Sequence, residues 1–268
     1  MGKDFKLTKD NYYSKEANKE YMSCSQFKDF VKCEKEALAK VNGELVETKT
    51  DALLFGGYVD AYFSNELDEY KANNPEMFNS RTGELKAQFK NIDEVIKTIE
   101  NDELLLESLS GEHQKIMVGE IGGVKFKIKI DSYFEGKMIV DQKIIKSIYD
   151  KEWVEGTGYC NFIEKYGYCI QGAIYQEIVR QNTGKQLPFV LAITTKEENP
   201  DKALIQIDQE YLDEALKFVE SLAPRYDLIK SGVIEPLSCG KCPTCRKDKK
   251  LKGIVSYKKI FKRTESEN

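Results

Sequence analysis

Histidine is almost absent from this chain of 268 residues, which contains a single one, His113. This scarcity excludes a catalytic zinc site built from several histidines, and a Ser/His catalytic triad would have to use His113 itself. His113 lies in the polar stretch 110–115, which we expect to be a loop. We therefore interpret it as an ordinary surface histidine and look for the chemistry in other side chains.

Long apolar runs are also missing. The run 52–59 stops at Asp60, and no run approaches the ~18 residues that a membrane-spanning helix needs. The first ten residues are charged and contain no apolar stretch, so we expect no signal peptide. The chain has seven cysteines, an odd number that argues against a disulfide framework. We expect a protein of the reducing cytoplasm with thiolates available for metal binding.

The composition is that of a globular protein. Hydrophobic residues make up 41% and charged residues 32% of the chain, which excludes a disordered tail or a collagen-like repeat. The net charge of −4 is unevenly distributed, because residues 246–268 carry nine basic and three acidic side chains. A basic tail on an acidic body suits contact with a polyanion, although a solvated C-terminus is the commoner explanation.

The first part of the chain has helical periodicity. A capping-box spacing after Ser23 and the apolar repeat that follows predict a helix over about 24–41. A second helix is expected from near Asp51, and the helical pattern resumes over 92–109. The polar segment 68–89 between them contains turn signals and is expected to be a loop.

The middle of the chain changes to a period of two, which is typical of a strand with one apolar face. Apolar side chains alternate with charged ones over 124–131, and the turn Glu135-Gly136 leads into a second strand over 137–145, so we predict a hairpin. The remaining expected elements are a helix at 161–182, strands at 189–194 and 203–207, and a helix at 209–231. We predict an α/β fold, a mixed central sheet flanked by helices, with a cysteine-bearing C-terminal appendage.

Acidic side chains gather on this hairpin. Asp131 ends its first strand, while Asp141 and Lys143 share one face of the second and Gln142 points the other way. Two carboxylates on neighbouring strands repel each other unless a cation such as Mg²⁺ lies between them. Lys143 could stabilise charge on a phosphate or orient a water. Solvated strand residues joined by an ion pair are the alternative, but the surrounding strand is apolar, which favours metal-assisted phosphodiester hydrolysis.

This pattern resembles the D…(D/E)-x-K signature of the PD-(D/E)XK nuclease superfamily, with Asp131 as its first residue and Asp141-Gln142-Lys143 as the rest. Further along the chain, Gln171 and Tyr175 resemble the Q-x-x-x-Y motif of its RecB-like and lambda-exonuclease-like branch. They are four apart on an expected helix and so share a face. The resemblance implies that they support Lys143 and position the DNA backbone; ordinary helix packing is the alternative.

A fourth motif lies upstream, where Gly56 and Asp60 resemble the G-x-x-x-H motif of the same branch. The glycine permits close approach of another backbone, for catalysis or for simple helix crossing. Asp60 stands where that pattern has a metal-binding histidine. An aspartate also binds Mg²⁺ and suits it better than imidazole does, so the resemblance implies Asp60, Asp131 and Asp141 as the metal ligands.

The C-terminal region contains a cysteine motif, Cys239-Gly-Lys-Cys242-Pro-Thr-Cys245, whose spacing and loop residues favour metal binding. Three thiols need a fourth ligand. We expect Cys33, because it lies about 110° from the apolar stripe of the helix over 24–41, with Cys24 as the reserve. Cys160 and Cys169 flank an apolar helix and are expected to be core thiols.

One cysteine before the G-x-x-x-H motif and three near the C-terminus resemble the iron–sulfur nucleases of the AddB type and the CRISPR-associated RecB-like type. This resemblance implies a [4Fe-4S] cluster held by Cys33, Cys239, Cys242 and Cys245. Structural Zn²⁺ is the alternative, since four thiolates suit either.

Two more side chains are distinctive. Glu34 lies in the apolar stripe of the first expected helix and needs a partner, for which we favour an ion pair over a role in bracing the active site. Trp153 follows the hairpin, and we expect core packing ahead of stacking on a terminal base.

Together the motifs resemble phage or prophage exonucleases of the exodeoxyribonuclease VIII kind. This implies a restriction-endonuclease-like core over residues 1–238, with the cysteine cluster and basic tail, 239–268, packed on it. It also implies a Mg²⁺- or Mn²⁺-dependent DNA exonuclease of the bacterial cytoplasm that resects double-stranded ends 5′ to 3′ beside a single-strand annealing recombinase. The alternatives are a CRISPR-type end-trimming nuclease and a non-catalytic DNA-binding module on a nuclease fold.

Overall fold

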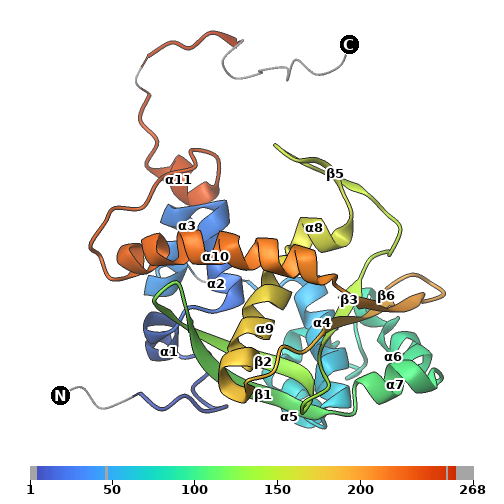
Figure 1. Ribbon diagram of the computed structural model, residues 1–268. Helices are drawn as coiled ribbons and strands as arrows, with labels where there is room; N and C mark the ends of the chain where they lie inside the picture. The colour runs from blue at the N-terminus through green and yellow to red at the C-terminus, as the bar shows by residue number, and fades with distance from the viewer. Residues whose placement is uncertain (1–4, 46–47, 252, 258–268) are drawn as a thin grey trace, which may run out of the picture.

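A central sheet of five strands organises the computed structural model, which describes residues 5–45, 48–251 and 253–257 (Figure 1). The strand order is β1–β2–β3–β6–β7; β3 and β6 run parallel, and the other neighbours are antiparallel. The strands are β1 (Glu112–Ile121), β2 (Val124–Phe134), β3 (Met138–Ile145), β6 (Phe189–Thr195) and β7 (Lys202–Gln206). The mixed sheet flanked by helices that the sequence predicts is confirmed.

The predicted hairpin of β2 and β3 is present, but the sheet contains one strand more than we expected. The stretch 110–115 is not a loop: most of it belongs to β1, which pairs with β2 and contains His113. The turn between β1 and β2 uses Gly122 and Gly123, whose φ angles of 58° and 77° suit a tight hairpin turn. This Gly-Gly pair was the available sequence signal for β1.

One face of the sheet is covered by α9 (Tyr168–Thr183) and α10 (Gln209–Lys230), which pack on each other and on β1 and β2. The helix α2 (Cys24–Lys32) also packs on β2 and α9. Their apolar side chains form the larger core of the molecule with the strands, through residues such as Phe27, Phe126, Ile174, Phe189 and Val219. Burial of these large side chains is the main stabilising contribution, at about 25 cal/mol per Å² of apolar surface.

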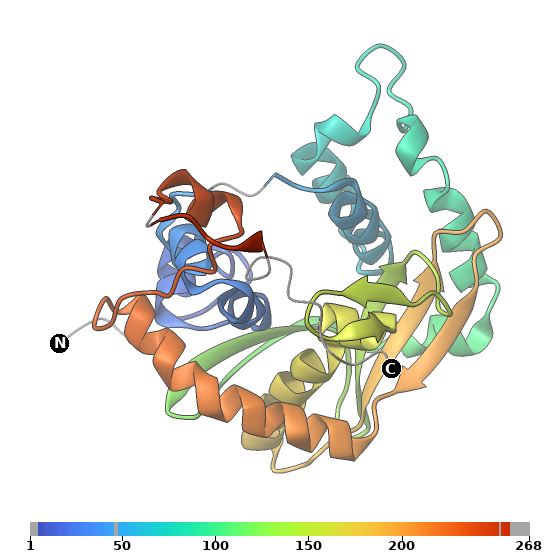
Figure 2. The same cartoon turned by 90° about the horizontal axis from the view of Figure 1, so that it is seen from above.

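The opposite face is covered by α4 (Asp51–Phe63) and α6 (Ile92–Glu100), as the separate group of helices in Figure 2 shows. They form a second core that reaches the sheet at Val140 and Ala192. The segment 68–89 between them is more ordered than the predicted loop. It contains α5 (Leu67–Asn73) and the 3₁₀ turns Pro75–Met77 and Ala87–Phe89, and it contributes buried apolar side chains to this core. α7 (Glu103–Ser108) follows α6.

Two helices that we predicted as continuous are interrupted. The helix over 24–41 consists of α2 and α3 (Glu34–Asn42), and Cys33 between them has extended backbone, with φ −164° and ψ 110°. Cys33 therefore occupies a helix junction and not the flank of one helix. The helix over 161–182 is likewise divided by Gly167, whose φ is 62°, into α8 (Phe162–Tyr166) and α9.

The remaining elements lie outside the central sheet and are α1 (Lys15–Glu20), the hairpin of β4 (Glu152–Val154) and β5 (Gly158–Cys160), and α11 (Pro243–Lys247). Trp153 lies on this hairpin and is 68% exposed, so our expectation of core packing is wrong. The basic tail continues into residues 252 and 258–268, which lie outside the described part of the chain. No helix in the described residues is long and apolar enough to cross a membrane.

Candidate active site and cysteine cluster

A cleft of about 700 Å³ opens above the hairpin of β2 and β3. Its lining comes from α2, α3 and α4, from the three strands β1 to β3, and from α9. All the residues that the sequence predicts as catalytic or as ligands of the catalytic metal lie in it: Asp60, Asp131, Asp141, Lys143, Gln171 and Tyr175. Four motifs far apart in the chain are therefore brought to one cleft.

Asp141 is the most deeply buried carboxylate of this group, with 1% of its surface exposed. Its Oδ1 accepts a hydrogen bond of 2.6 Å from Nε2 of Gln171 on α9. Its Oδ2 forms an ion pair with the Lys143 ammonium, two residues along β3. The Gln171 side chain thus contacts Asp141 directly, whereas the resemblance implied that it supports Lys143.

Asp131 lies on the adjacent strand β2, and its Oδ2 accepts a 2.9 Å hydrogen bond from the backbone N–H of Gln142. Burial, together with the negative charges of Asp141 and Asp60, raises the pKa of Asp131 well above its usual range. Burial alone would lower the pKa of Lys143, but Asp141 and Asp131 outweigh it and raise that pKa, so Lys143 stays protonated. The carboxyl groups of Asp60, Asp131 and Asp141 therefore lie close to the positive charge of Lys143.

Asp60 reaches this group from α4. Burial raises the pKa of its carboxyl group, against the opposing effect of the nearby Lys129 and Lys143 charges. Both of its oxygens accept hydrogen bonds from Nε2 of Gln114, at 3.2 and 3.1 Å. Gln114 lies on β1 in the stretch that we expected to be a loop, and no motif in the sequence singles it out.

The glycines before Asp60 differ from our expectation. A Cβ added at Gly56 would meet nothing within 4 Å, so no neighbouring backbone packs closely against this glycine. A Cβ at its neighbour Gly57 would lie 2.5 Å from the hydroxyl oxygen of Tyr70, which in turn donates a hydrogen bond to the carbonyl of Leu54. Gly57 is thus the glycine that permits close packing, here of α4 against α5.

Tyr175 lies one turn beyond Gln171 on α9 and is buried. Its hydroxyl donates a 3.1 Å hydrogen bond to the backbone carbonyl of Lys129 on β2. Burial raises its pKa well above the usual range, so the hydroxyl remains a neutral donor. Tyr175 therefore joins α9 to the strand that carries Asp131, through a hydrogen bond to Lys129 and not to Lys143.

Basic and aromatic side chains line the cleft beside the carboxylates. The Lys129 ammonium lies 4.8 Å from the centre of the Tyr13 ring, and Lys28 on α2 also lines the cleft. Lys127 is buried beneath Tyr12 and hydrogen-bonds to Asn18, and burial lowers its pKa to about 8. A chain of phosphates could lie along these side chains, because lysine and tyrosine are among the side chains that bind phosphate backbones.

The three carboxylates provide a donor set that fits a hard divalent cation. All their donor atoms are oxygens, and the proximity of their negative charges is unfavourable unless a cation lies between them. They do not converge as closely as four thiols elsewhere in the described chain, whose sulfur atoms all lie within 4.8 Å of one another.

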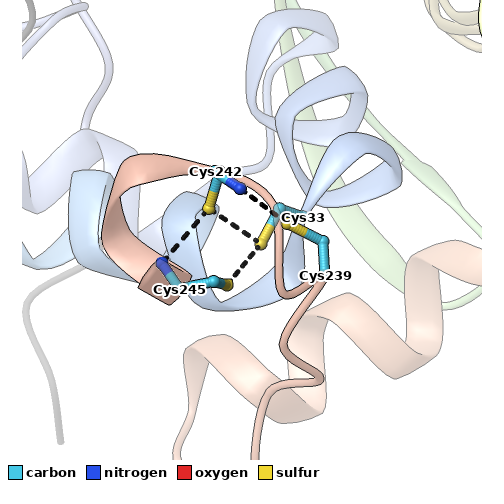
Figure 3. Close-up of side chains that lie close together, drawn as sticks. All are labelled: Cys33, Cys239, Cys242 and Cys245. Carbon is cyan, nitrogen blue, oxygen red and sulfur yellow. Dashed lines mark hydrogen bonds between the residues drawn. The ribbon is translucent and has the colours of Figure 1, made fainter. Parts of the chain in front are cut away.

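Cys33, Cys239, Cys242 and Cys245 form this second cluster, with all four sulfur atoms within 4.8 Å of one another (Figure 3). The sulfur of Cys33 lies 3.4 Å from that of Cys245 and 3.7 Å from that of Cys242. The cysteine cluster that the sequence predicts is thus present, with Cys33 as its fourth member. Cys24, the reserve candidate, lines the cleft instead.

Backbone N–H groups of the C-terminal loop point at these sulfurs. Those of Lys241 and Cys242 lie 3.5 and 3.3 Å from Cys239 Sγ and lower the pKa of this thiol. Burial would raise the pKa of Cys245, but hydrogen bonds from Ser238 and the backbone of Gly240 lower it to about 6. Burial raises the pKa of the other two thiols, Cys33 and Cys242. Thiolates are the metal-binding form of cysteine, so the loop favours metal ligation by Cys239 and Cys245 in particular.

The cluster is tied to the body of the protein by Glu34, next to Cys33. Its carboxylate forms a two-pronged ion pair with Arg225 on α10, at 2.7 and 2.8 Å, and accepts the backbone N–H of Leu237 at 2.7 Å. The hydrogen bond from Arg225 lowers the pKa of Glu34. The ion pair that we favoured for Glu34 is therefore present.

Comparison with known proteins identifies the family. The profile of a PDDEXK-like domain of unknown function (DUF3799) matches residues 23–248. The crystal structure of a protein from Eubacterium rectale named "Putative exonuclease" is 47% identical in sequence, with a TM-score of 0.89, and the match covers 98% of this chain and 99% of that one. A second structure, SSO0001, is 13% identical with a TM-score of 0.28, covering 82% and 95%.

No curated protein matches the chain significantly. The profile match extends over most of the chain, from the capping residue of α2 to the end of α11. It includes the whole cleft from Asp60 to Tyr175 and all four clustered cysteines. The chain therefore belongs to this PDDEXK-like family, and its fold is that of a nuclease.

Proposed function

We propose that the protein is a metal-dependent DNA exonuclease that resects double-stranded ends for phage-type recombination. The observation that carries the proposal is the convergence of Asp131, Asp141 and Lys143 in one cleft with Asp60 and Gln171. A phosphodiester is negatively charged and hydrolyses slowly, so its cleavage requires charge neutralisation and an oriented water. The cleft offers groups for both tasks.

In this proposal Asp131 and Asp141 hold a divalent cation, with Asp60 as a third ligand. The cation, Mg²⁺ or Mn²⁺, would neutralise the carboxylates and polarise the scissile phosphate. Lys143, kept protonated by Asp141 and Asp131, stabilises negative charge on the phosphate and orients the attacking water. Gln171 fixes the orientation of Asp141 through its 2.6 Å hydrogen bond.

The hydrogen bond from Tyr175 to the Lys129 carbonyl holds α9 against β2. It thereby fixes the position of Asp131, two residues further along β2. Lys28 and Lys129, which also line the cleft, would contact the DNA backbone. The preference for double-stranded ends, the 5′ to 3′ direction and the annealing recombinase partner rest on the family resemblance that the sequence shows.

The decisive experiment is digestion of linear duplex DNA carrying a label at one 5′ or one 3′ end, with Mg²⁺ or Mn²⁺ and with closed circular DNA as control. We expect linear DNA to be shortened from one type of end while the circle stays intact. Asp141→Ala should abolish cleavage and spare DNA binding. Full activity of Asp141→Ala would contradict the assignment.

The same assay separates the two alternatives. A CRISPR-type end-trimming nuclease would prefer single-stranded overhangs and would associate with an integrase. A DNA-binding module would bind the labelled duplex but leave it intact with either cation. Asp60 in place of histidine keeps this second alternative open, because it changes the charge of the metal site.

For the cysteine cluster we propose a single tetrahedral ion, Zn²⁺, ahead of the [4Fe-4S] cluster that the resemblance implies. Four thiolates at a Zn–S distance of about 2.3 Å place their sulfurs about 3.8 Å apart. The sulfur of Cys33 lies 3.4 and 3.7 Å from those of Cys245 and Cys242, and all four sulfurs lie within 4.8 Å of one another, which suits one small ion. An iron–sulfur cluster places irons and sulfides between the thiolates, which then lie further apart.

Anaerobic purification followed by metal analysis and an absorbance spectrum tests this choice. A colourless protein with one zinc per chain supports the single ion. A brown protein that contains iron and acid-labile sulfide would contradict it and restore the iron–sulfur interpretation. Neither result bears on the nuclease site, which lies in the separate cleft.

A further inference from the structure

Gln114 has an unusual backbone conformation for a residue inside a strand. Its φ is 54°, in the left-handed region that a glycine adopts freely and other side chains disfavour. The pairs on either side of it, His113 with Ser132 and Lys115 with Ile130, are regular, so the distortion is confined to the position facing Asp131. Strained conformations of this kind persist where the surrounding structure requires the side chain to be where it is.

The side chain of Gln114 is 7% exposed and lines the cleft. Its Nε2 donates to both oxygens of Asp60. An ionised carboxylate only accepts hydrogen bonds, so the nitrogen end of the amide must face Asp60 and the oxygen end must face away from it. This Oε1 is buried and has no hydrogen-bond partner among the described residues. A buried amide oxygen without a partner is unfavourable unless something else binds it.

We propose that Gln114 belongs to the divalent-cation site, where its Nε2 orients Asp60 and its Oε1 is a neutral oxygen ligand. Amide oxygens are ordinary ligands of hard cations. With Gln114, the site has three carboxylates and one carbonyl oxygen, all of which suit Mg²⁺ better than the imidazole of the G-x-x-x-H pattern does. Asp60 and Gln114 act as a unit at the position where that pattern has one neutral histidine, and Asp60 adds a negative charge to the site. This inference rests on the proposed metal-dependent function.

The test is a direct measurement of cation binding to the full chain without DNA, by calorimetric titration with Mg²⁺ and with Mn²⁺. Gln114→Gly removes the amide and also removes the backbone strain, because glycine adopts this φ freely. We expect the variant to melt at the same or a higher temperature than the wild type and to bind Mg²⁺ about 10- to 100-fold more weakly. A purely structural glutamine would give a lower melting temperature and unchanged binding.

The matched control is Asn65→Gly. Asn65 is the other described residue, glycines apart, with a positive φ, at 60°, and it is exposed just beyond the end of α4. This variant relieves the same kind of backbone strain away from the cleft. It should bind Mg²⁺ as the wild type does.

Asp60→His tests the predicted cation preference. It replaces a carboxylate by a softer nitrogen ligand, so the ratio of Mg²⁺ to Mn²⁺ affinity should fall at least tenfold. The double variant Asp60→His/Gln114→Gly completes a thermodynamic cycle. The change Gln114→Gly should reduce Mg²⁺ affinity less in the Asp60→His variant than in the wild type, because the Nε2 contact with the Asp60 carboxylate is already lost there.

Unchanged Mg²⁺ affinity in Gln114→Gly would overturn the inference, and so would a wild-type chain that binds neither cation. A wild-type chain that binds Mg²⁺ but cuts no DNA would contradict the proposed nuclease function alone. The two failures are therefore distinguishable, because cation binding is measured without cleavage.

Discussion

Nε2 of Gln171 lies 2.6 Å from Oδ1 of Asp141, and this hydrogen bond joins α9 to β3 at the centre of the cleft. The other carboxylate oxygen is left for Lys143. Asp141 is buried, so an unrestrained carboxylate would lose both its orientation and a favourable contact. The bond therefore couples the packing of the helix to the position of a catalytic candidate.

We predict that Gln171→Met lowers both the cleavage rate and the stability. The methionine fills a similar volume but cannot donate to Asp141, so we expect a 10- to 100-fold loss in kcat and a decrease of about 1–3 kcal/mol in unfolding free energy. Steady-state cleavage assays and urea unfolding measure the two effects.

Gln176→Met is the matched control for this change. Gln176 lies on the same helix, is equally buried, and donates a hydrogen bond to the carbonyl of Leu187, outside the cleft. The Gln176→Met variant should lose a comparable amount of stability. At temperatures below its melting temperature, its cleavage rate should equal that of the wild type. Equal kinetic losses in the two variants would show that Gln171 acts on stability alone.

Asp131→Asn should remove cleavage without destabilising the protein. The carboxylate of Asp131 is buried beside the charges of Asp141 and Asp60, which together raise its pKa. An asparagine can still accept the backbone N–H of Gln142, and it removes one of the repelling charges. We expect the unfolding free energy in Mg²⁺-free buffer at neutral pH to be unchanged or up to about 1–2 kcal/mol higher. A clearly less stable Asp131→Asn variant would contradict this electrostatic account.

The sequence predicted the carboxylates and the lysine of the cleft because they follow from a local pattern. The period of two over β2 and β3 determines the face on which Asp131, Asp141 and Lys143 lie. Gln114 could not be found in this way. Its position depends on a strand whose burial pattern is irregular and on a backbone conformation that no local residue pattern indicates.

Cys33 was chosen correctly but for an incorrect reason. We assigned it to the side of a continuous helix, whereas it lies at the junction of α2 and α3, where the extended backbone turns it toward the C-terminal loop.

The prediction for Trp153 was wrong because aromatic side chains are usually buried, whereas this one lies on a hairpin outside the central sheet and packs edge-on against Tyr159. Tertiary context decided both outcomes.

The ion pair of Glu34 and Arg225 should make stability depend on pH in the acidic range. Arg225 lowers the pKa of Glu34, so the contribution is complete above the unfolded-state pKa of about 4.3 and is lost as the pH falls through the lower folded-state value. We expect Glu34→Gln to lower the unfolding free energy at pH 7 by about 1–3 kcal/mol. The difference from wild type should shrink below about pH 4, as urea unfolding at several pH values would show.

Glu94→Gln is the control for a surface pair. Both side chains of the Glu94–Lys97 pair on α6 are exposed, and their charged groups lie 3.9 Å apart. Such a pair contributes about 0.3–0.5 kcal/mol at most. If both variants lost the same stability at pH 7, the burial of Glu34 would not be the source of its effect.

The cysteine cluster should stabilise the fold without taking part in cleavage. It joins Cys33, at the junction of α2 and α3, to a loop more than two hundred residues later, so it closes a very long loop in the chain. We expect Cys242→Ser to lose most of its bound metal and to melt at a clearly lower temperature. Its cleavage rate should stay close to wild type at temperatures where it remains folded, because the carboxylates of the cleft are untouched.

Cys169→Ser is the control, since Cys169 is half-buried on α9 outside the cluster. It should keep the metal content of the wild type and change the melting temperature much less. Treating the wild type with a zinc chelator should reproduce the Cys242→Ser melting curve, because structural metal binding contributes directly to folding free energy. An unchanged melting temperature with lost cleavage in Cys242→Ser would instead place the cluster in the catalytic function of the protein.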